Sequence, residues 1–279
     1  MPLFKLCNDD QLVNTLHSVF NANIVRVPEA RINPLCMVAV TPQGPRFWGY
    51  LPDLVEGKKD LQNAIDRQKA IGESPMANVS GKKSRSVNLD LGLQILEGFL
   101  GGFGLPSAGI AAKFNGAKTV SFSFQGVARS FISPGTLGKL LGDHALDKGN
   151  TANDLFFQQA ASLLVTDSVI TSRDFSIQVG ETKSSDFKLD VPAIQNIVGK
   201  ANAAVKVETT TGLDITFKGD TPLTFAFTCL RCNADSAGRL SLVPHFEKVS
   251  FGVEKMVRGN DADYPPQQLY NAPGLIEWQ

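Results

Sequence analysis

The chain has 279 residues, and 43% of them are hydrophobic, which is enough to bury a sizeable core in one large domain or two small ones and excludes a wholly disordered protein. Its 27 basic and 27 acidic residues balance, so the intact chain has no overall attraction for nucleic acid or anionic lipid. It has four cysteines, no secretory apolar segment near the N-terminus and no apolar run close to the roughly 20 residues of a spanning helix. These features predict a protein of the reducing cytoplasm that is soluble at rest.

The first third of the chain is predicted to start with a helix and to continue as short strands. Asp9 and Asp10 occupy N-cap positions, and the apolar residues of 9–20 then share one helical face. Residues 57–71 have the pattern of a solvated helix, and the polar, basic segment 78–86 predicts a loop. Short apolar runs separated by prolines indicate small strands joined by turns: 23–27, 35–40 and 46–51.

Two alternating segments on either side of a Gly/Pro break predict an antiparallel pair of strands. In the first, apolar residues recur at period two before the spacing becomes helical from Leu96 onward, so we expect a strand that runs into a short helix. In the second, residues 119–125, the apolar residues share one face and the polar residues share the other. A helix over 133–146 follows, with Ser133 and Pro134 at its N-cap and first turn. The alternating apolar positions are Val87, Leu89, Leu91 and Leu93, then Val120, Phe122 and Phe124.

The second half of the chain predicts a hairpin and then long alternating strands. Two alternating runs, 175–179 and 187–191, flank the polar segment 180–186 and indicate a hairpin with a polar tip. Residues 203–217 and 223–229 continue the alternation with one apolar and one polar face. Antiparallel sheets that are covered on one face produce this pattern. We therefore expect an α+β fold in which helices surround a twisted antiparallel sheet.

The C-terminal tail, residues 259–279, differs in composition from the rest of the chain. Its three prolines exclude a long helix, so we expect it to lie extended across the body and to bury its apolar anchors. It contains three acidic residues and no Lys or Arg, so removing it changes the formal charge from 0 to +3. A surplus of positive charge favours contact with anionic lipid. The predicted anchors are Leu269, Tyr270, Leu275, Ile276 and Trp278.

Motifs of enzyme chemistry are missing from the sequence. The three histidines stand alone, and none has the spacing of a metal site. HExxH, GxSxG and Walker motifs are absent, and the Gly-rich segment 98–104 lacks the partners of a nucleotide site. Cys229 and Cys232 have CxxC spacing without a second pair, which favours two strand cysteines on opposite or offset faces over a redox or zinc site. We therefore expect no enzyme activity, no metal and no cofactor.

Three segments of the chain resemble the bacterial gasdermins. They are VFNANIVRVPEARINPL (19–35), after a short helix and an early cysteine; NLDLGLQILEGFLGGFG followed by KTVSFSFQGV; and VKVETTTGLDITFKGDTPLTFAFTCLRC (205–232). The resemblance implies a fold like the gasdermin N-terminal domain, closed by a short C-terminal inhibitory peptide. It also implies a cytoplasmic antiviral, anti-phage defence protein that a partner protease activates, after which large oligomeric β-barrel pores kill the infected cell.

The resemblance also implies roles for particular residues. Residues 1–258 would form the pore-forming domain, and 259–279 the autoinhibitory peptide. Cys7 would carry a palmitoyl group; the alternative is an ordinary exposed thiol. Arg258 suits a trypsin-like protease, whereas Asp261 or Asp263 suits a caspase-like one. The predicted cleavage region comprises Glu254, Lys255, Met256, Val257, Arg258, Gly259, Asn260, Asp261 and Asp263.

The predicted membrane-inserting segments lie near 85–130 and 161–190. Spanning strands present one apolar face to lipid and one polar face to water, and they close into a barrel so that no backbone group is left unpaired. The partners expected are membrane lipids of the inner membrane, the activating protease and further copies of the chain in the pore, with a monomer at rest and no nucleic acid. The residues assigned to inserting strands are Val87, Leu89, Leu91, Leu93, Val120, Phe122, Phe124, Phe175, Ile177, Val179, Phe187 and Leu189.

Two other readings of the sequence stay open. The chain is alternatively a non-lytic intracellular β-rich module that binds lipid or another ligand, with the tail as a structural strap. An enzyme whose site is assembled from scattered Asp, His and Ser residues is the third possibility, because catalytic groups need not be adjacent in sequence. Release of dye from vesicles by the tail-truncated protein distinguishes the pore-forming reading from both.

Overall fold

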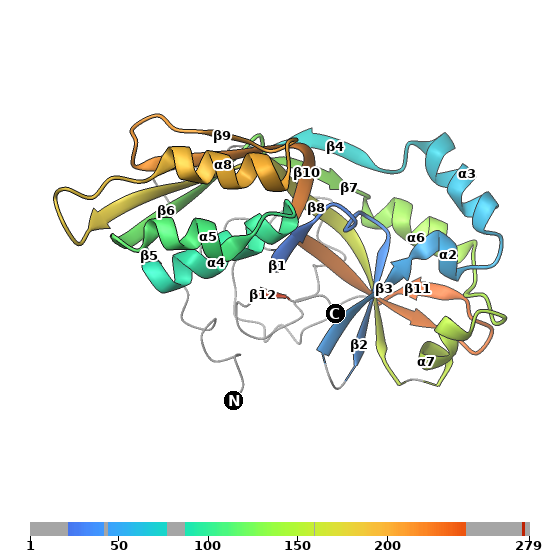
Figure 1. The fold of residues 1–279 in the computed structure, drawn as a ribbon. Coiled ribbons are helices and arrows are strands. Elements are labelled where there is room, and N and C mark those ends of the chain that lie inside the picture. Colours follow the sequence, from blue (N-terminus) through green and yellow to red (C-terminus); the bar gives the residue numbers. More distant parts are fainter. Residues whose placement is uncertain (1–21, 42–43, 77–86, 159, 244–274, 277–279) are drawn as a thin grey trace, which may run out of the picture.

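Two long antiparallel strands, β8 (Ser162–Thr182) and β10 (Asp214–Ala234), form the spine of the fold (Figure 1). The computed structural model describes residues 22–41, 44–76, 87–158, 160–243 and 275–276. Several predicted features lie outside the described residues: the helix over 9–20, Cys7, the loop at 78–86 and the cleavage region 254–263.

The other strands of the sheet pair on either side of this spine. The main path has the order β12-β1-β10-β8-β2-β3, and all its pairings are antiparallel except the one between β1 and β12. The strands on this path are β1 (Asn23–Glu29), β2 (Cys36–Thr41), β3 (Gly44–Tyr50) and β12 (Leu275–Ile276). The shorter strands off the path, which pair with β8, with β10 or with one another, are β4 (Gly72–Pro75), β5 (Val87–Asn88), β6 (Ala117–Gln125), β7 (Ala128–Phe131), β9 (Lys206–Glu208) and β11 (Leu240–Leu242).

Helices cover the sheet in two groups, one at each end of the spine (Figure 1). The first group packs over the end formed by β6 and the neighbouring halves of β8 and β10: α4 (Leu89–Gly102), α5 (Ser107–Ala111) and α8 (Val191–Ala201). The second group packs over the other end: α2 (Leu51–Leu54), α3 (Lys58–Gln68), α6 (Pro134–Gly142) and α7 (Asp154–Phe157). Each group encloses its own hydrophobic core, so the predicted α+β class is confirmed.

Several predicted elements are confirmed by the structure. The three early strands correspond to β1, β2 and β3, the solvated helix to α3, and the alternating segment 119–125 to β6. The helix predicted over 133–146 is α6, and the Ser133 hydroxyl accepts a hydrogen bond from the Thr136 backbone N–H at 3.2 Å, as an N-cap should. The predicted antiparallel pair also forms, but with only two residues on one side, because Val87 pairs with Val120 and Asn88 with Thr119.

The strand predicted over 87–93 is wrong after its second residue. Leu89, Leu91 and Leu93 belong to helix α4, which begins at Leu89. Positions 89, 93, 96 and 100 also repeat at the helical spacing of three and four residues, so leucines at these positions satisfy both periods. The helical period continues further along the chain, and its residues Leu96 and Leu100 are buried, so this segment forms a helix and not a strand.

The hairpin predicted across 180–186 is also wrong. The first strand is the end of β8, but Phe187 and Leu189 lie in an irregular segment outside the strands, and Val191 is the first residue of helix α8. The Asp190 carboxylate accepts a hydrogen bond from the Ala193 backbone N–H at 3.2 Å, and a proline occupies the first turn. This cap and proline start a helix where the apolar alternation had indicated a strand.

The long strand predicted over 203–217 is interrupted. Only β9 and the beginning of β10 are strand, and a turn at residues 209–213 separates them. The Asp214 carboxylate accepts hydrogen bonds from the backbone N–H groups of Thr210 and Thr211, and Gly212 has a positive φ of 74°. Glycine adopts this conformation at little cost, so the chain reverses here and lays β9 beside β10.

Candidate membrane-inserting ribbon

Three strands form an amphipathic ribbon at the end of the spine. We define the ribbon as residues 117–125 of β6, 174–182 of β8 and 214–218 of β10. Because these strands pair in register, their apolar side chains fall into cross-strand rows. One row is Phe122, Ile177 and Ile215, and the next is Phe124, Phe175 and Phe217.

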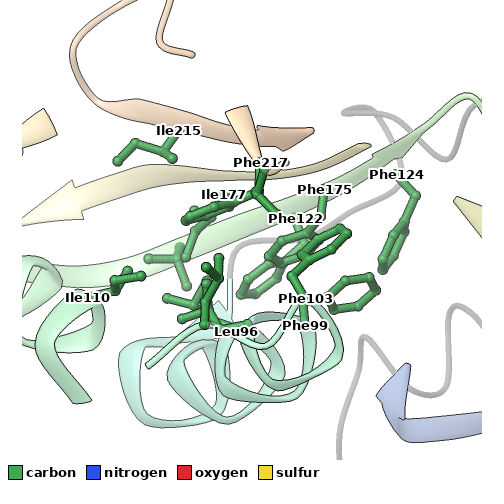
Figure 2. Close-up of a cluster of buried hydrophobic side chains, with 14 of the residues drawn as sticks. Leu96, Phe99, Phe103, Ile110, Phe122, Phe124, Phe175, Ile177, Ile215 and Phe217 are labelled. Carbon is green, nitrogen blue, oxygen red and sulfur yellow. The ribbon is translucent and has the colours of Figure 1, made fainter. Parts of the chain in front are cut away.

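The apolar face of the ribbon is buried against the helices (Figure 2). Phe99 of α4 stacks on Phe175 with ring centroids 4.2 Å apart and an angle of 6° between the ring planes. Phe124 stacks on Phe225 at 4.5 Å, which extends the aromatic cluster along β10. Burial of each large apolar side chain contributes about 1.5–3 kcal/mol. The helices therefore stabilise the ribbon at rest by removing a face from water that would otherwise be exposed.

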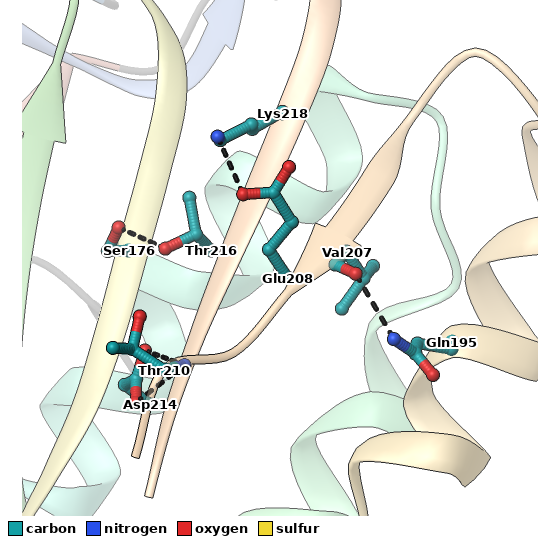
Figure 3. Close-up of polar contacts among 8 residues, drawn as sticks. All are labelled: Ser176, Gln195, Val207, Glu208, Thr210, Asp214, Thr216 and Lys218. Carbon is teal, nitrogen blue, oxygen red and sulfur yellow. Dashed lines mark hydrogen bonds and ion pairs between the residues drawn. The ribbon is translucent and has the colours of Figure 1, made fainter. Parts of the chain in front are cut away.

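The opposite face of the ribbon is polar and open. The hydroxyls of Ser176 and Thr216 form a hydrogen bond of 2.7 Å across the strands (Figure 3). Further hydroxyl and amide side chains line a hollow of about 300 Å³ over this face: Ser121, Ser123, Gln125, Gln178, Thr210 and Thr211. The ribbon thus has one apolar and one polar face, the arrangement that a strand between lipid and water requires.

Strand β9 closes the ribbon's outer edge with charged and polar contacts (Figure 3). Lys218 of β10 lies 2.6 Å from the Glu208 carboxylate, and this hydrogen-bonded partner raises the pKa of the lysine. The Gln195 side chain of α8 donates a hydrogen bond of 3.2 Å to the Val207 carbonyl. Helix α8 is therefore tied to β9 as well as to the apolar core beneath it.

Two residues of the C-terminal tail, Leu275 and Ile276, lie at the edge of the sheet. Strand β12 pairs in parallel with β1, where Ile24 is opposite Leu275 and Val25 is opposite Ile276. Two of the predicted anchors, Leu275 and Ile276, are thereby placed on the body of the protein. The other three, Leu269, Tyr270 and Trp278, lie outside the described residues.

A family model described as the Bacterial Gasdermin Family matches residues 25–239, which is most of the chain. The chain belongs to the bacterial gasdermins. A curated gasdermin from Vitiosangium sp. (strain GDMCC 1.1324) is 30% identical over 80% of this chain and 81% of the relative. Another, from a Desulfuromonadales bacterium, is 28% identical over 90% of this chain and 91% of the relative.

The solved structures agree with this assignment at the level of the fold. The structure of a bacterial gasdermin from Bradyrhizobium tropiciagri aligns with a TM-score of 0.55 and 16% identity, covering 85% of this chain and 93% of the other. Gasdermins are pore-forming proteins and not enzymes, so the predictions of a pore-forming protein and of no enzyme activity are confirmed at this level.

Six of the twelve predicted inserting residues of this gasdermin lie together on the ribbon's apolar face. Val87 of β5 pairs with Val120 of β6, and Phe187 and Leu189 pack against the core under the ribbon from the segment before α8. Ile215 and Phe217 also lie on this face, although they are not among the predicted inserting residues. Their place in the alternating segment 203–217 is the signal in the sequence that could have identified them. The predicted inserting residues that share the face are Val120, Phe122, Phe124, Phe175, Ile177 and Val179.

The described cysteines of this gasdermin are structural. Cys229 packs into the core on one face of β10 and Cys232 into the core on the other, which confirms the reading of two strand cysteines on opposite faces. Cys36 is buried too, and burial raises its pKa to about 11. Among the described residues, no group of His, Cys, Asp or Glu could hold a metal ion. The helices of the described part are all too short or too polar to cross a membrane.

Proposed function

We propose that this gasdermin is autoinhibited, and that proteolytic removal of its C-terminal peptide lets it oligomerise into β-barrel pores that kill the cell in defence against phage. The observation that carries the proposal is the ribbon. Its apolar face is held under helices while its polar face meets water. Replacing the helices by lipid keeps the apolar face out of water, provided that the strands close into a barrel and leave no backbone group unpaired.

The lengths of the strands support this proposal and indicate what must change. Strand β6 has nine residues, close to the 9–11 residues of a spanning strand. Its hairpin partner in the same chain is only the two-residue β5, and the regular part of β10 in the ribbon has five residues. The segments 89–116 and 183–213, which form α4, α5 and α8 at rest, would have to extend as strands to complete two spanning hairpins.

The tail is the proposed restraint. Strand β12 occupies an edge of β1 that would otherwise offer unpaired backbone groups to another strand. Loss of residues 259–279 would also leave the body with a formal charge of +3, which favours anionic lipid. The cleavage region stays between Glu254 and Asp263, with Arg258 for a trypsin-like protease and Asp261 or Asp263 for a caspase-like one.

The remaining parts of the proposal concern location and lipidation. The resting chain would be a cytoplasmic monomer, and the activated chain an oligomer in the inner membrane. A palmitoyl group on Cys7 would add buried apolar area at roughly 0.8 kcal/mol per methylene and strengthen membrane attachment. Membrane lipids and the activating protease are the expected partners.

Vesicle leakage tests the proposed function. A recognition sequence for a specific protease is inserted after Arg258 in the full-length chain, and the protein is cut in the presence of dye-loaded vesicles of bacterial polar lipid. We expect dye release only after cutting. The control is the same chain with a scrambled recognition sequence and the same protease. Complete cutting without dye release would reject pore formation and favour the non-lytic binding module.

A further inference from the structure

The spine bends where the ribbon meets the rest of the sheet. Lys218 pairs with Asp174 and Leu223 with Ser172, so the four residues 219–222 of β10 stand opposite Arg173 alone. This is a large, irregular bulge, and the glycine and proline inside it, Gly219 and Pro222, are typical of such irregularities. The regular part of β10 in the ribbon therefore stops at the bend.

The end of helix α4 lies directly on this bend. Phe103 follows the last residue of α4 and is buried, 7% exposed. A Cβ added at Gly219 would lie 2.5 Å from Cε1 of the Phe103 ring, far inside van der Waals contact. Only glycine at position 219 leaves room for the ring in this position. Figure 2 shows Phe103 beside Phe99 beneath the strands of the ribbon.

The backbone of Phe103 is held from a second direction. The side-chain amide of Asn202, just after α8, donates a hydrogen bond of 2.9 Å to the Phe103 carbonyl. Gly104 follows with a positive φ of 68°, and the Leu105 N–H returns to the Leu100 carbonyl at 2.7 Å, which ends the helix at this point. The ends of α4 and α8 and the bulge of β10 thus meet at Phe103.

We propose that Phe103, seated on Gly219, is a latch that holds α4 on the bend of β10 and sets the rate at which the helices leave the ribbon. The inference rests on the proposed function, because it names the contact that must break before segment 89–116 extends. Once the ring leaves Gly219, both the helix end and the bulge lose a packing partner. Release of α4 and straightening of β10 are therefore one event.

Two substitutions break the latch from opposite sides. Gly219→Ala pushes the ring away, and Phe103→Leu removes it. In the cleavable full-length chain, each is expected to shorten the half-time of dye release after cutting by about fivefold or more, the size expected for misfitting one methyl group in a packed core. The double variant is expected to be no faster than the faster single variant, because both changes remove the same contact.

A matched control separates the latch from general loss of packing. Phe156→Leu removes a buried ring from the core at the other end of the spine, and its release rate is expected to stay close to that of the unmodified chain. Unchanged release rates in both latch variants, while the unmodified cut chain leaks, would overturn the latch and leave the proposed function intact.

Hydrogen exchange in the uncut full-length chain tests the latch without any pore. The backbone amides of α4 are expected to exchange about fivefold faster or more in Phe103→Leu and Gly219→Ala, and at the unmodified rate in Phe156→Leu. If Gly219→Ala does not fold, Phe103→Leu still gives the result. Unchanged exchange in α4, or an equal increase in Phe156→Leu, would overturn the proposal.

Discussion

At the scale of single residues, Asp167 is the most unusual group in the sheet. Thr228 pairs with Ser168 and Cys229 with Thr166, so Asp167 is the extra residue of a β-bulge in β8. Its side chain is only 6% exposed, and among the described residues its Oδ1 atom has no hydrogen-bond partner. Burial raises the pKa of this carboxyl, although the Thr228 side chain and, to a smaller extent, the Arg129 guanidinium act in the opposite direction.

This residue predicts a pH dependence of stability. Because the pKa of Asp167 is higher in the folded chain than in the unfolded chain, the folded chain binds more protons, and stability falls as pH rises from about 4 through the folded pKa. Asp167→Asn removes this loss. We expect the free energy of unfolding to rise by roughly 1–3 kcal/mol at pH 7 relative to the unmodified chain, with a difference that shrinks toward pH 4.

Urea unfolding measured from pH 4 to pH 8 checks this prediction. The exposed Asp186, changed to Asn, is the matched control and is expected to alter stability little at any pH. A difference between Asp167→Asn and the unmodified chain that stays constant across this range would contradict the account of the buried carboxyl.

At the scale of elements, we predict that the buried apolar side chains of helix α4 hold this helix on the sheet. Leu96 is fully buried in the core under the ribbon, whereas the adjacent Glu97 is exposed. Leu96→Ala is expected to lower the free energy of unfolding by about 2–5 kcal/mol, because it removes apolar contacts and leaves a cavity. Glu97→Ala is expected to change it by no more than about 0.5 kcal/mol. Equal effects of the two substitutions in urea unfolding would show that α4 is not held by this core.

The elements also show what the sequence can and cannot predict. The alternation of Val120, Phe122 and Phe124 identified β6 and its buried face, because a strand covered on one side has a single pattern. The leucines of 89–93 are compatible with both the strand period of two and the helical spacing of three and four. The segment forms a helix because the helical spacing continues further along the chain. At Asp190 the N-cap and the following proline outweigh the apolar alternation, and both are local signals for a helix that the sequence contains.

The candidate site, like the fold, can be predicted from the sequence only in part. Sequence alternation placed six inserting residues on one face, but the row partners Ile215 and Phe217 depend on which strands are neighbours. Strand β10 lies between β1 and β8 in the sheet, although these strands are not consecutive in sequence. The latch between Phe103 and Gly219 joins a helix end to a bulge over 100 residues away, and no local pattern predicts such a contact.

At the scale of the whole molecule, we predict that the two ends of the spine behave differently when the pore forms. The core under α2, α3, α6 and α7 packs on the end where β2, β3 and β11 widen the sheet. The core under α4, α5 and α8 covers a ribbon of three main strands. We expect the first end to persist in the pore and the second to rearrange, because the ribbon combines one apolar and one polar face and contains the nine-residue β6, which is close to the length of a spanning strand.

Infrared spectroscopy of the amide I band tests the central claim most directly. The cleavable full-length chain is bound to vesicles and measured before and after cutting. We predict that the helical component decreases and the strand component increases as dye escapes, because α4, α5 and α8 extend into strands. Dye escape with an unchanged helical component would contradict the claim that these helices give way to a membrane-spanning ribbon.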